Sequence, residues 1–188
     1  MASGPRYRVR TKRRRNGQTM YHRRLKLLKG KTTRFVVRLT NKNVICQLVD
    51  YLPQGDKTLA TATSKSLSEY GWKGGLSNTS AAYLTGFLLG KKANAEKAIL
   101  DIGLHAEVKG SRVYAAAKGL QDAGVEIPLG DVSPDESRLT GSHIQEYAKS
   151  IDDAARKVKF SAYYKNNIDP TKFVDHFNEV KKKIEGAK

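Results

Sequence analysis

Cysteine and long apolar segments are scarce in this sequence. Cys46 is the single cysteine among 188 residues, so no intrachain disulfide can form, as is typical of proteins in a reducing compartment. No segment approaches the roughly 18 apolar residues that span a bilayer, and the N-terminus lacks the apolar stretch of a secretory signal. We therefore expect a soluble cytoplasmic protein with no membrane partner. A mitochondrial presequence, which is also basic and poor in acids, is a minor alternative.

Residues arranged for catalysis or metal binding are also lacking. The four histidines have no metal-ligand spacing, the lone cysteine has no convincing histidine partner, and no Gly-x-Ser-x-Gly motif occurs. A nuclease of the ribonuclease H type needs clustered carboxylates that hold two metal ions. Residues 34–40, the first expected strand, offer none, and aspartates elsewhere are scattered: Asp50, Asp56, Asp101 and Asp122. We expect no catalytic residue, no metal, no cofactor and no small-molecule substrate.

Acidic residues are absent from residues 1–31, which we call the arm. The arm holds twelve of the 35 basic residues, so residues 32–188 hold the other 23 together with all 18 acids, a net charge of +5 against +17 for the whole chain. The twelve are Arg6, Arg8, Arg10, Lys12, Arg13, Arg14, Arg15, Arg23, Arg24, Lys26, Lys29 and Lys31. Such a segment repels itself and becomes ordered on dense negative charge, most commonly a nucleic-acid backbone.

The side chains of the arm suit RNA. The run Lys12–Arg15 can donate bidentate hydrogen bonds to phosphates, and Tyr7 and Tyr21 offer aromatic surface for unpaired bases. The alternatives are a solvated tail or a localisation signal. Basic residues alone do not distinguish RNA from DNA.

Three short strands are expected after the arm. Phe35, Val37 and Leu39 alternate with other residues at strand periodicity, and further β-rich runs cover residues 44–51 and 58–63. Turn signals separate the three runs, and links this short require an antiparallel meander.

The pattern changes to helical periodicity at Asn78, which can cap a helix. A buried strand is expected at residues 99–103, then a helix that follows Ser111 and ends at Gly124, and a final edge strand at residues 125–127. The order β-β-β-α-β-α-β predicts an α/β fold, a mixed sheet with helices packed on its faces.

The last third of the chain is expected to be helical. Residues 128–139 form a polar connector, Ser142 begins a capping-box pattern, and Asp169-Pro170 starts a further helix. An apolar stripe then follows at helical spacing, and packing within the chain is the favoured interpretation over a partner groove: Phe173, Phe177, Val180 and Ile184. We therefore divide the chain into the arm (1–31), an α/β core (32–128) and a connector with a helical extension (129–188).

The segment Tyr70-Gly71-Trp72-Lys73-Gly74-Gly75 lies between the third strand and the first core helix. Its glycines allow a ligand to approach the backbone, while its tryptophan equally fits a buried anchor of an ordinary loop. The segment lacks the lysine-serine/threonine ending of a nucleotide-binding P-loop.

The order of several motifs resembles one family of ribosomal large-subunit proteins, the protein eighteen family in its archaeal form. The segments that carry the resemblance are Lys12-Arg13-Arg14-Arg15-Asn16-Gly17, Arg23-Arg24-Leu25, Val36-Val37-Arg38-Leu39-Thr40-Asn41-Lys42, Tyr70-Gly71-Trp72-Lys73, Asn78 to Gly86, Leu100 to Leu104, Lys109 to Val113 and Asp122 to Pro128. The resemblance covers nearly the whole chain, and the length favours the archaeal form over the shorter bacterial and longer eukaryotic ones.

This resemblance implies a three-layer α/β/α core with a mixed sheet. It implies a structural protein whose arm and adjoining core surface bind 5S rRNA and help attach it to 23S rRNA in the central protuberance, beside neighbouring large-subunit proteins. The residues expected to bind rRNA are Arg6, Arg8, Arg10, Lys12, Arg13, Arg14, Arg15, Tyr21, Arg23, Arg24, Trp72 and Lys73. The alternatives are a nonspecific DNA-compacting chromatin protein and an RNA-processing nuclease of similar fold.

Overall fold

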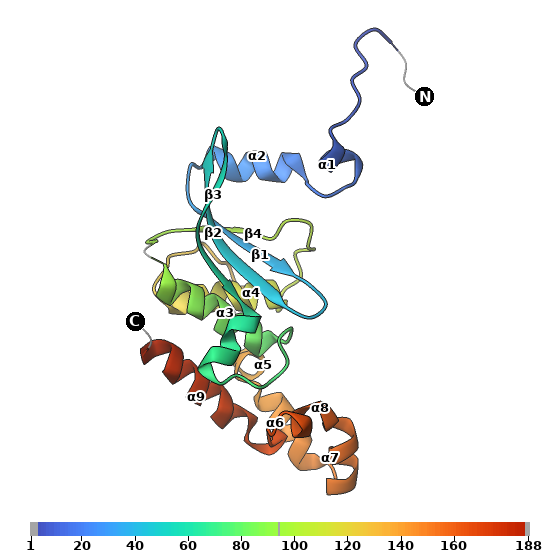
Figure 1. Cartoon of the computed structure of the whole chain (residues 1–188), viewed down its shortest axis with the longest axis vertical. Coiled ribbons are helices and arrows are strands. Elements are labelled where there is room, and N and C mark those ends of the chain that lie inside the picture. The colour runs from blue at the N-terminus through green and yellow to red at the C-terminus, as the bar shows by residue number, and fades with distance from the viewer. Residues whose placement is uncertain (1–3, 94, 187–188) are drawn as a thin grey trace.

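A computed structural model describes residues 4–93 and 95–186 (Figure 1). Its elements occur in the following order: α1 (Lys12–Arg15), α2 (Tyr21–Lys29), β1 (Arg34–Leu39), β2 (Val44–Leu52), β3 (Gly55–Thr63), the 3-10 helix η1 (Ser64–Tyr70), α3 (Thr79–Lys92), β4 (Ile99–Asp101), α4 (Arg112–Asp122), α5 (Glu136–Thr140), α6 (Ser142–Ser150), α7 (Asp153–Lys159), α8 (Ser161–Lys165), the 3-10 helix η2 (Pro170–Lys172) and α9 (Phe173–Gly186).

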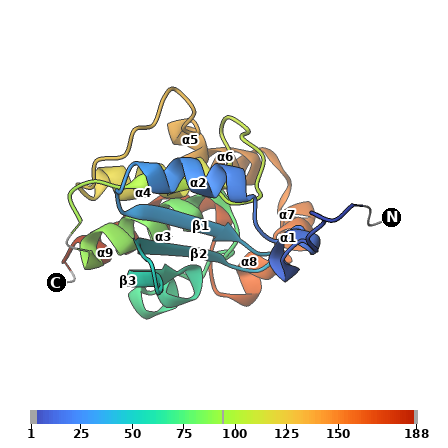
Figure 2. The same cartoon turned by 90° about the horizontal axis from the view of Figure 1, so that it is seen from above.

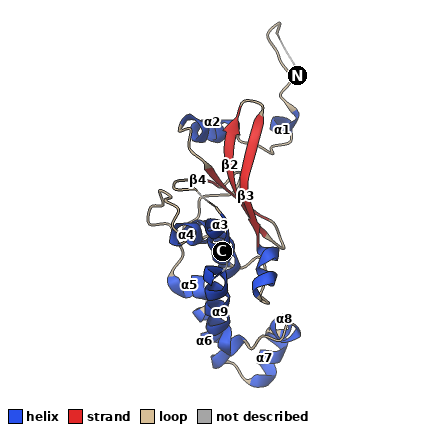
Figure 3. Ribbon diagram, turned by 60° about the vertical axis from the view of Figure 1, so that its left-hand side comes forward, coloured by secondary structure: helices blue, strands red, loops and turns tan. Residues whose placement is uncertain are grey.

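The four strands form one mixed sheet in the order β3-β2-β1-β4. Figure 3 draws strands of this sheet in red, with helices in blue. β1 pairs antiparallel with β2, and β2 with β3, which confirms the expected meander. β4 pairs parallel with β1 after the crossover through α3, as a parallel connection requires. β3 starts at Gly55, earlier than expected, so the β2–β3 hairpin is longer than its apolar pattern indicates.

Alternation along β1 divides its side chains between the two faces of the sheet. Phe35 and Val37 are fully buried in the core with Cys46 and Leu48 of β2, on the face of the sheet that α3 and α4 cover. The other face of β1 carries Arg34 and Arg38, on the side where α2 lies. Figure 1 shows α2 above the sheet and α3 with α4 below it, so helices cover both faces and the expected α/β fold is confirmed.

The helices α3 and α4 pack closely through small residues. Asn78 caps α3 as expected, because its side chain accepts a hydrogen bond of 2.7 Å from the amide of Ala81. A Cβ atom at Gly86 would overlap the carbonyl oxygen of Ala116, so only glycine allows this approach of the two helices. Gly124 ends the α4 segment at φ +109°, the left-handed conformation expected there.

The apolar stripe of α9 packs within the chain, as the favoured interpretation states. Its four residues Phe173, Phe177, Val180 and Ile184 are each at most 2% exposed and belong to the main core. Phe177 lies against Tyr83 of α3, with ring centroids 5.8 Å apart. The helical extension therefore shares the hydrophobic core of the α/β sheet.

Several local expectations differ from the structure. β4 ends at Asp101, two residues before the expected end of the strand at residue 103. The helix α5 begins at Glu136, inside the expected connector of residues 128–139. Residues 125–127 do not form a strand: Glu126 makes a single parallel bridge with Lys97, and Pro128 follows without an amide hydrogen to continue the ladder. Ser142 does not cap α6; the cap is Gly141 at φ +83°, where a Cβ atom would overlap the Phe173 ring.

Candidate RNA interface

The first part of the arm is exposed to solvent throughout. Every residue from 4 to 18 is exposed, and the short helix α1 consists entirely of basic residues. The exposed set includes these predicted rRNA-binding residues: Arg6, Arg8, Arg10, Lys12, Arg13, Arg14 and Arg15. The structure thus presents their charges to solvent with no acidic residue of the arm among them.

The second part of the arm, α2, lies against the outer face of the sheet. Leu27 and Leu28 are half-buried, and Gly30 at its end lies against Ile99 of β4. The predicted residues Tyr21 and Arg23 are exposed on this helix. In Figures 1 and 2, α2 lies over the sheet while residues 4–11, which precede α1, extend away from the molecule.

A buried guanidinium lies under α2. The side chain of Arg34 on β1 is 3% exposed, and its Nη1 donates a hydrogen bond of 3.0 Å to Asp101 Oδ2 on β4. Its Nη2 lies 2.8 Å from Asp56 Oδ2, which belongs to the start of β3. A buried cation without partners would be strongly destabilising, so both carboxylates are needed where they lie.

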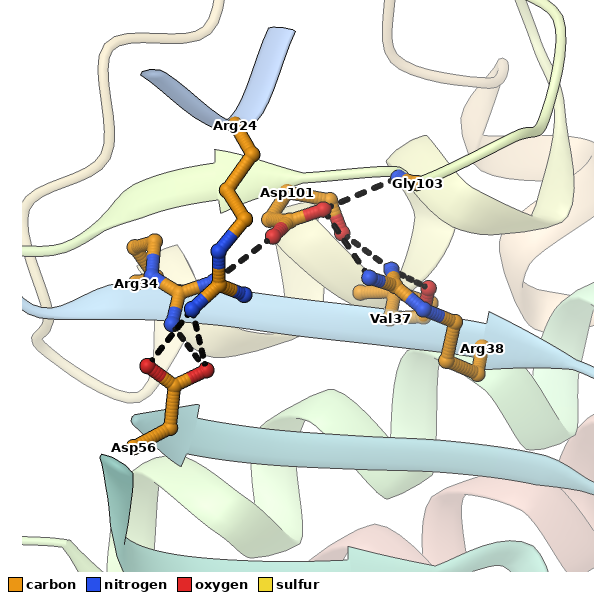
Figure 4. Close-up of polar contacts among 7 residues, drawn as sticks. All are labelled: Arg24, Arg34, Val37, Arg38, Asp56, Asp101 and Gly103. Atoms are coloured by element: carbon orange, nitrogen blue, oxygen red, sulfur yellow. Dashed lines mark hydrogen bonds and ion pairs between the residues drawn. The ribbon is translucent and has the colours of Figure 1, made fainter. Parts of the chain in front are cut away.

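Two further arginines extend this pair of contacts (Figure 4). Arg24 of α2 donates two hydrogen bonds from Nη2 to the two carboxylate oxygens of Asp56, at 2.8 and 2.9 Å. Arg38 of β1 donates to the Asp101 carboxylate at 3.0 Å and to the Asp101 carbonyl at 2.8 Å. The five residues form one line of alternating charge, Arg24–Asp56–Arg34–Asp101–Arg38, which we call the ion-pair network.

The ion-pair network changes the acidity of Asp56. Partial burial acts to raise the pKa of this carboxyl, but the hydrogen bonds and positive charges of Arg24 and Arg34 outweigh it, so the pKa lies below its ordinary value. Asp56 is therefore a carboxylate at neutral pH, and it ties α2 to the sheet.

A pocket of about 620 Å³ opens between α2 and the segment that follows β4. Its cationic side chains come from both walls, Arg13, Arg23, Arg24 and Lys26 from the arm and Arg38 from the core. Two acids also line it, and each is paired: Asp101 within the ion-pair network, and Glu107 with Arg23 at 3.7 Å. We call this cavity the arm–core pocket.

The predicted pair Trp72 and Lys73 is not brought together with the arm. Trp72 is 2% exposed, with its ring stacked on His176 of α9 at 5.2 Å and its Nε1 donating to the Gly75 carbonyl. This burial matches the interpretation of the indole as the anchor of a loop and leaves its ring no free face for a base. Lys73 is exposed beside it. RNA contact by either residue stays a prediction.

Spacing along the sequence does not indicate the ion-pair network. Asp56 and Asp101 appear scattered because 45 positions separate them, and folding brings both to one guanidinium. The available signal is the placement of Arg34 and Arg38 four residues apart on an alternating strand, which puts both on one face. In the sequence, Arg24 is one of the twelve basic residues of the arm, and nothing distinguishes it from the exposed arginines. Only the structure shows that its guanidinium is paired with Asp56.

Within residues 4–93 and 95–186, no three His, Cys, Asp or Glu side chains gather where they could hold a metal ion. In the same residues, no helix has the length and apolar character needed to cross a membrane.

An exposed basic segment fixed at its base to an α/β core defines a nucleic-acid-binding protein with a basic extension. Comparison with known proteins narrows this class. Residues 5–97 match the sequence model of the family described as "Ribosomal large subunit proteins 60S L5, and 50S L18". The matched segment contains most of the arm, the first three strands and α3.

Three archaeal proteins, each named large ribosomal subunit protein uL18, are similar over the whole chain. The protein of Methanothermobacter thermautotrophicus is 48% identical over 189 residues, covering 98% of both chains. That of Methanosphaera stadtmanae is 49% identical, covering 100% of this chain and 99% of its own, and that of Thermofilum pendens is 47% identical with the same coverage. The chain therefore belongs to the uL18 family of large-subunit ribosomal proteins, which are structural constituents and not enzymes.

The ion-pair network predicts that Asp101→Asn destabilises the fold. The substitution leaves the guanidinium of Arg34 buried with one carboxylate fewer, and breaking a buried ion pair in this way costs about 3–5 kcal/mol. Urea unfolding measures the loss. Asp131→Asn is the matched control, because the side chain of Asp131 is 94% exposed in its pair with Lys109 and the change should leave the stability nearly unaltered. Equal stability of the two variants would contradict a structural role for the network.

The lowered pKa of Asp56 predicts a defined loss of stability in acid. The folded-state pKa is below that of the unfolded chain, so the contribution is complete above the unfolded value of about 4 and is lost as the pH falls through the folded value. The difference in unfolding free energy between the wild type and Asp56→Asn should be constant from pH 7 to about pH 5 and shrink below pH 4. A difference that grows as the pH falls would show that the carboxylate form is not the stabilising one.

Proposed function

We propose that this protein binds 5S rRNA and helps attach it to 23S rRNA in the central protuberance of the large ribosomal subunit. Membership of the uL18 family makes it a structural ribosomal protein, with cytoplasmic ribosomes as its location. The single observation that carries the finer proposal is the division of the arm into an exposed cationic segment and a helix held on the core.

The exposed segment supplies affinity. Each arginine or lysine that meets a phosphate releases condensed counterions, so an array of such residues binds RNA tightly and with strong salt dependence. The proposed contacts in this segment are Arg6, Arg8, Arg10, Lys12, Arg13, Arg14 and Arg15. Seven cations lie within the ten residues 6–15, and the RNA orders the segment as it binds.

The folded core supplies placement. Arg24 is half-buried and fixed by two hydrogen bonds to Asp56, so α2 presents Tyr21 and Arg23 in a defined orientation. A rigid α2 beside the arm–core pocket can recognise the shape of an RNA backbone, and exposed tyrosine can stack on an unpaired base. The boundary proposed for the arm at residue 31 lies between the end of α2 at Lys29 and the start of β1 at Arg34.

The far end of the molecule offers a second contact region. Figure 1 shows α5–α9 at the opposite end from α1 and α2, and Lys73 lies near this end because its amide donates to His176 of α9. We assign this region to 23S rRNA and neighbouring large-subunit proteins. A protein with contact regions at both ends can connect two RNA molecules, as the proposed role requires.

Replacement of Arg13, Arg14 and Arg15 by glutamine tests the proposal in the full-length protein. We predict that 5S rRNA affinity falls strongly at physiological salt and that the slope of log affinity against log salt flattens by about 2–3, because three phosphate contacts are lost at about 0.7–0.9 each. Filter binding across a salt series measures both quantities.

The matched control removes three charges from the other end of the molecule, at the exposed residues Lys149, Lys157 and Lys165 of α6, α7 and α8. This variant should retain 5S rRNA affinity and its salt slope. An equal loss of 5S rRNA affinity in the two variants would mean that the total positive charge of the protein, and not the arm, determines binding. Equal affinity of the wild type for random duplex DNA and 5S rRNA in competition would instead favour the chromatin-protein alternative.

A further inference from the structure

The arm–core pocket has apolar walls that are open to solvent. Met20 and Leu27 line it from the arm, and Leu100 and Leu104 line it from the core. Met20 is 51% exposed and Leu104 is 55% exposed. Large apolar side chains that face a concave, solvent-filled space gain free energy when a flat apolar group covers them.

The pocket also carries positive charge that the core does not neutralise. Arg24 and Arg38 are held by carboxylates of the ion-pair network, but Arg13 and Lys26 make no ion pair with any residue in the described part of the chain. Among the residues that the structure describes, the Arg13 side chain donates one hydrogen bond, from Nε to Thr19 Oγ1 at 3.0 Å, and its terminal nitrogens have no partner there. An anion at the pocket would therefore meet two cations without displacing an internal partner.

The core wall of the pocket is built rigidly. The amide of Gly103 donates to Asp101 Oδ1 at 2.9 Å, and a Cβ atom at this glycine would lie 2.7 Å from the Arg38 guanidinium carbon. His105 accepts a hydrogen bond at Nε2 from the amide of Leu39, 3.3 Å away, which joins this wall to the end of β1. The ion-pair network thus holds the wall that faces the arm.

We propose that the arm–core pocket binds one unstacked nucleotide of RNA, with its base against Met20 and Leu104 and its phosphate near Arg13 and Lys26. This inference rests on the proposed function and names the part of the RNA that the site takes. A volume of about 620 Å³ lies within the range of about 300–1,000 Å³ of pockets for small ligands. A nucleotide is a flat ring joined to an anion, so it matches apolar walls that lie beside unpaired cations. An apolar peptide side chain fits less well, because it carries no negative charge that could pair with these cations.

Titration with single nucleotides tests the pocket directly. The full-length protein is titrated with each of the four ribonucleoside 5′-monophosphates and with inorganic phosphate, and the amide NMR signals of Leu104 and His105 are followed. We expect saturable shifts with at least one nucleotide and no shift at Leu104 with phosphate alone. An equal response to phosphate would overturn the proposal, because it would mean that the pocket binds only an anion.

A matched pair of variants links the pocket to 5S rRNA. Leu104→Glu places a carboxylate at the pocket. Val108→Glu is the control, because it makes the same change of charge in the same segment. Val108 is 59% exposed, similar to Leu104, and does not line the pocket. Leu104→Glu should abolish the nucleotide response and weaken 5S rRNA binding about tenfold, the scale of one lost base contact. Val108→Glu should keep both. Leu104→Ser, without a new charge, should also weaken binding, and circular dichroism checks that each variant is folded.

The failures of the two proposals are distinguishable. If Leu104→Glu and Val108→Glu bind 5S rRNA equally while the Arg13/Arg14/Arg15 variant binds weakly, the pocket proposal is wrong and the proposed function stands. If the arm variant retains full affinity, the proposed function itself is wrong, and the pocket proposal falls with it.

Discussion

The structure depends on one buried cation, the guanidinium of Arg34. A guanidinium at 3% exposure is tolerated only when carboxylates surround it, and Asp101 and Asp56 reach it from strands on either side of the β1–β2 pair. The same two carboxylates then bind Arg38 and Arg24. The position of α2, the length of the β2–β3 hairpin and the course of the chain after β4 are all coupled through these contacts.

This coupling gives the basic residues two different roles. Arg24, Arg34 and Arg38 are paired with carboxylates and hold the arm and the core together. The arginines between residues 6 and 15 are exposed and have no carboxylate of the arm nearby, so their charge is available to a polyanion. The formal net charge of +17 does not separate these roles; only the geometry shows which cations are paired with carboxylates and which are exposed.

The fold could be predicted from the sequence where one physical signal dominates. Alternation in β1, the cap at Asn78 and the stripe from Phe173 to Ile184 each act locally, and the structure contains all three. Prediction failed where partners are distant in sequence. Residues 125–127 have an apolar strand pattern but make only one bridge, and the ion-pair network joins residues from 24 to 101, which no local pattern reveals. The charge pattern alone indicates the arm. The arm–core pocket can be seen only in the folded structure, because its walls come from separate parts of the chain.

The proposed function makes this protein a partner of 5S rRNA within the large subunit. Mild dissociation of native large subunits, followed by sedimentation and identification of the RNA that remains with the protein, tests it most directly. The account predicts that the protein leaves the subunit as a complex that contains 5S rRNA. Recovery of the protein free of 5S rRNA, with the 5S rRNA still attached to 23S rRNA, would contradict it.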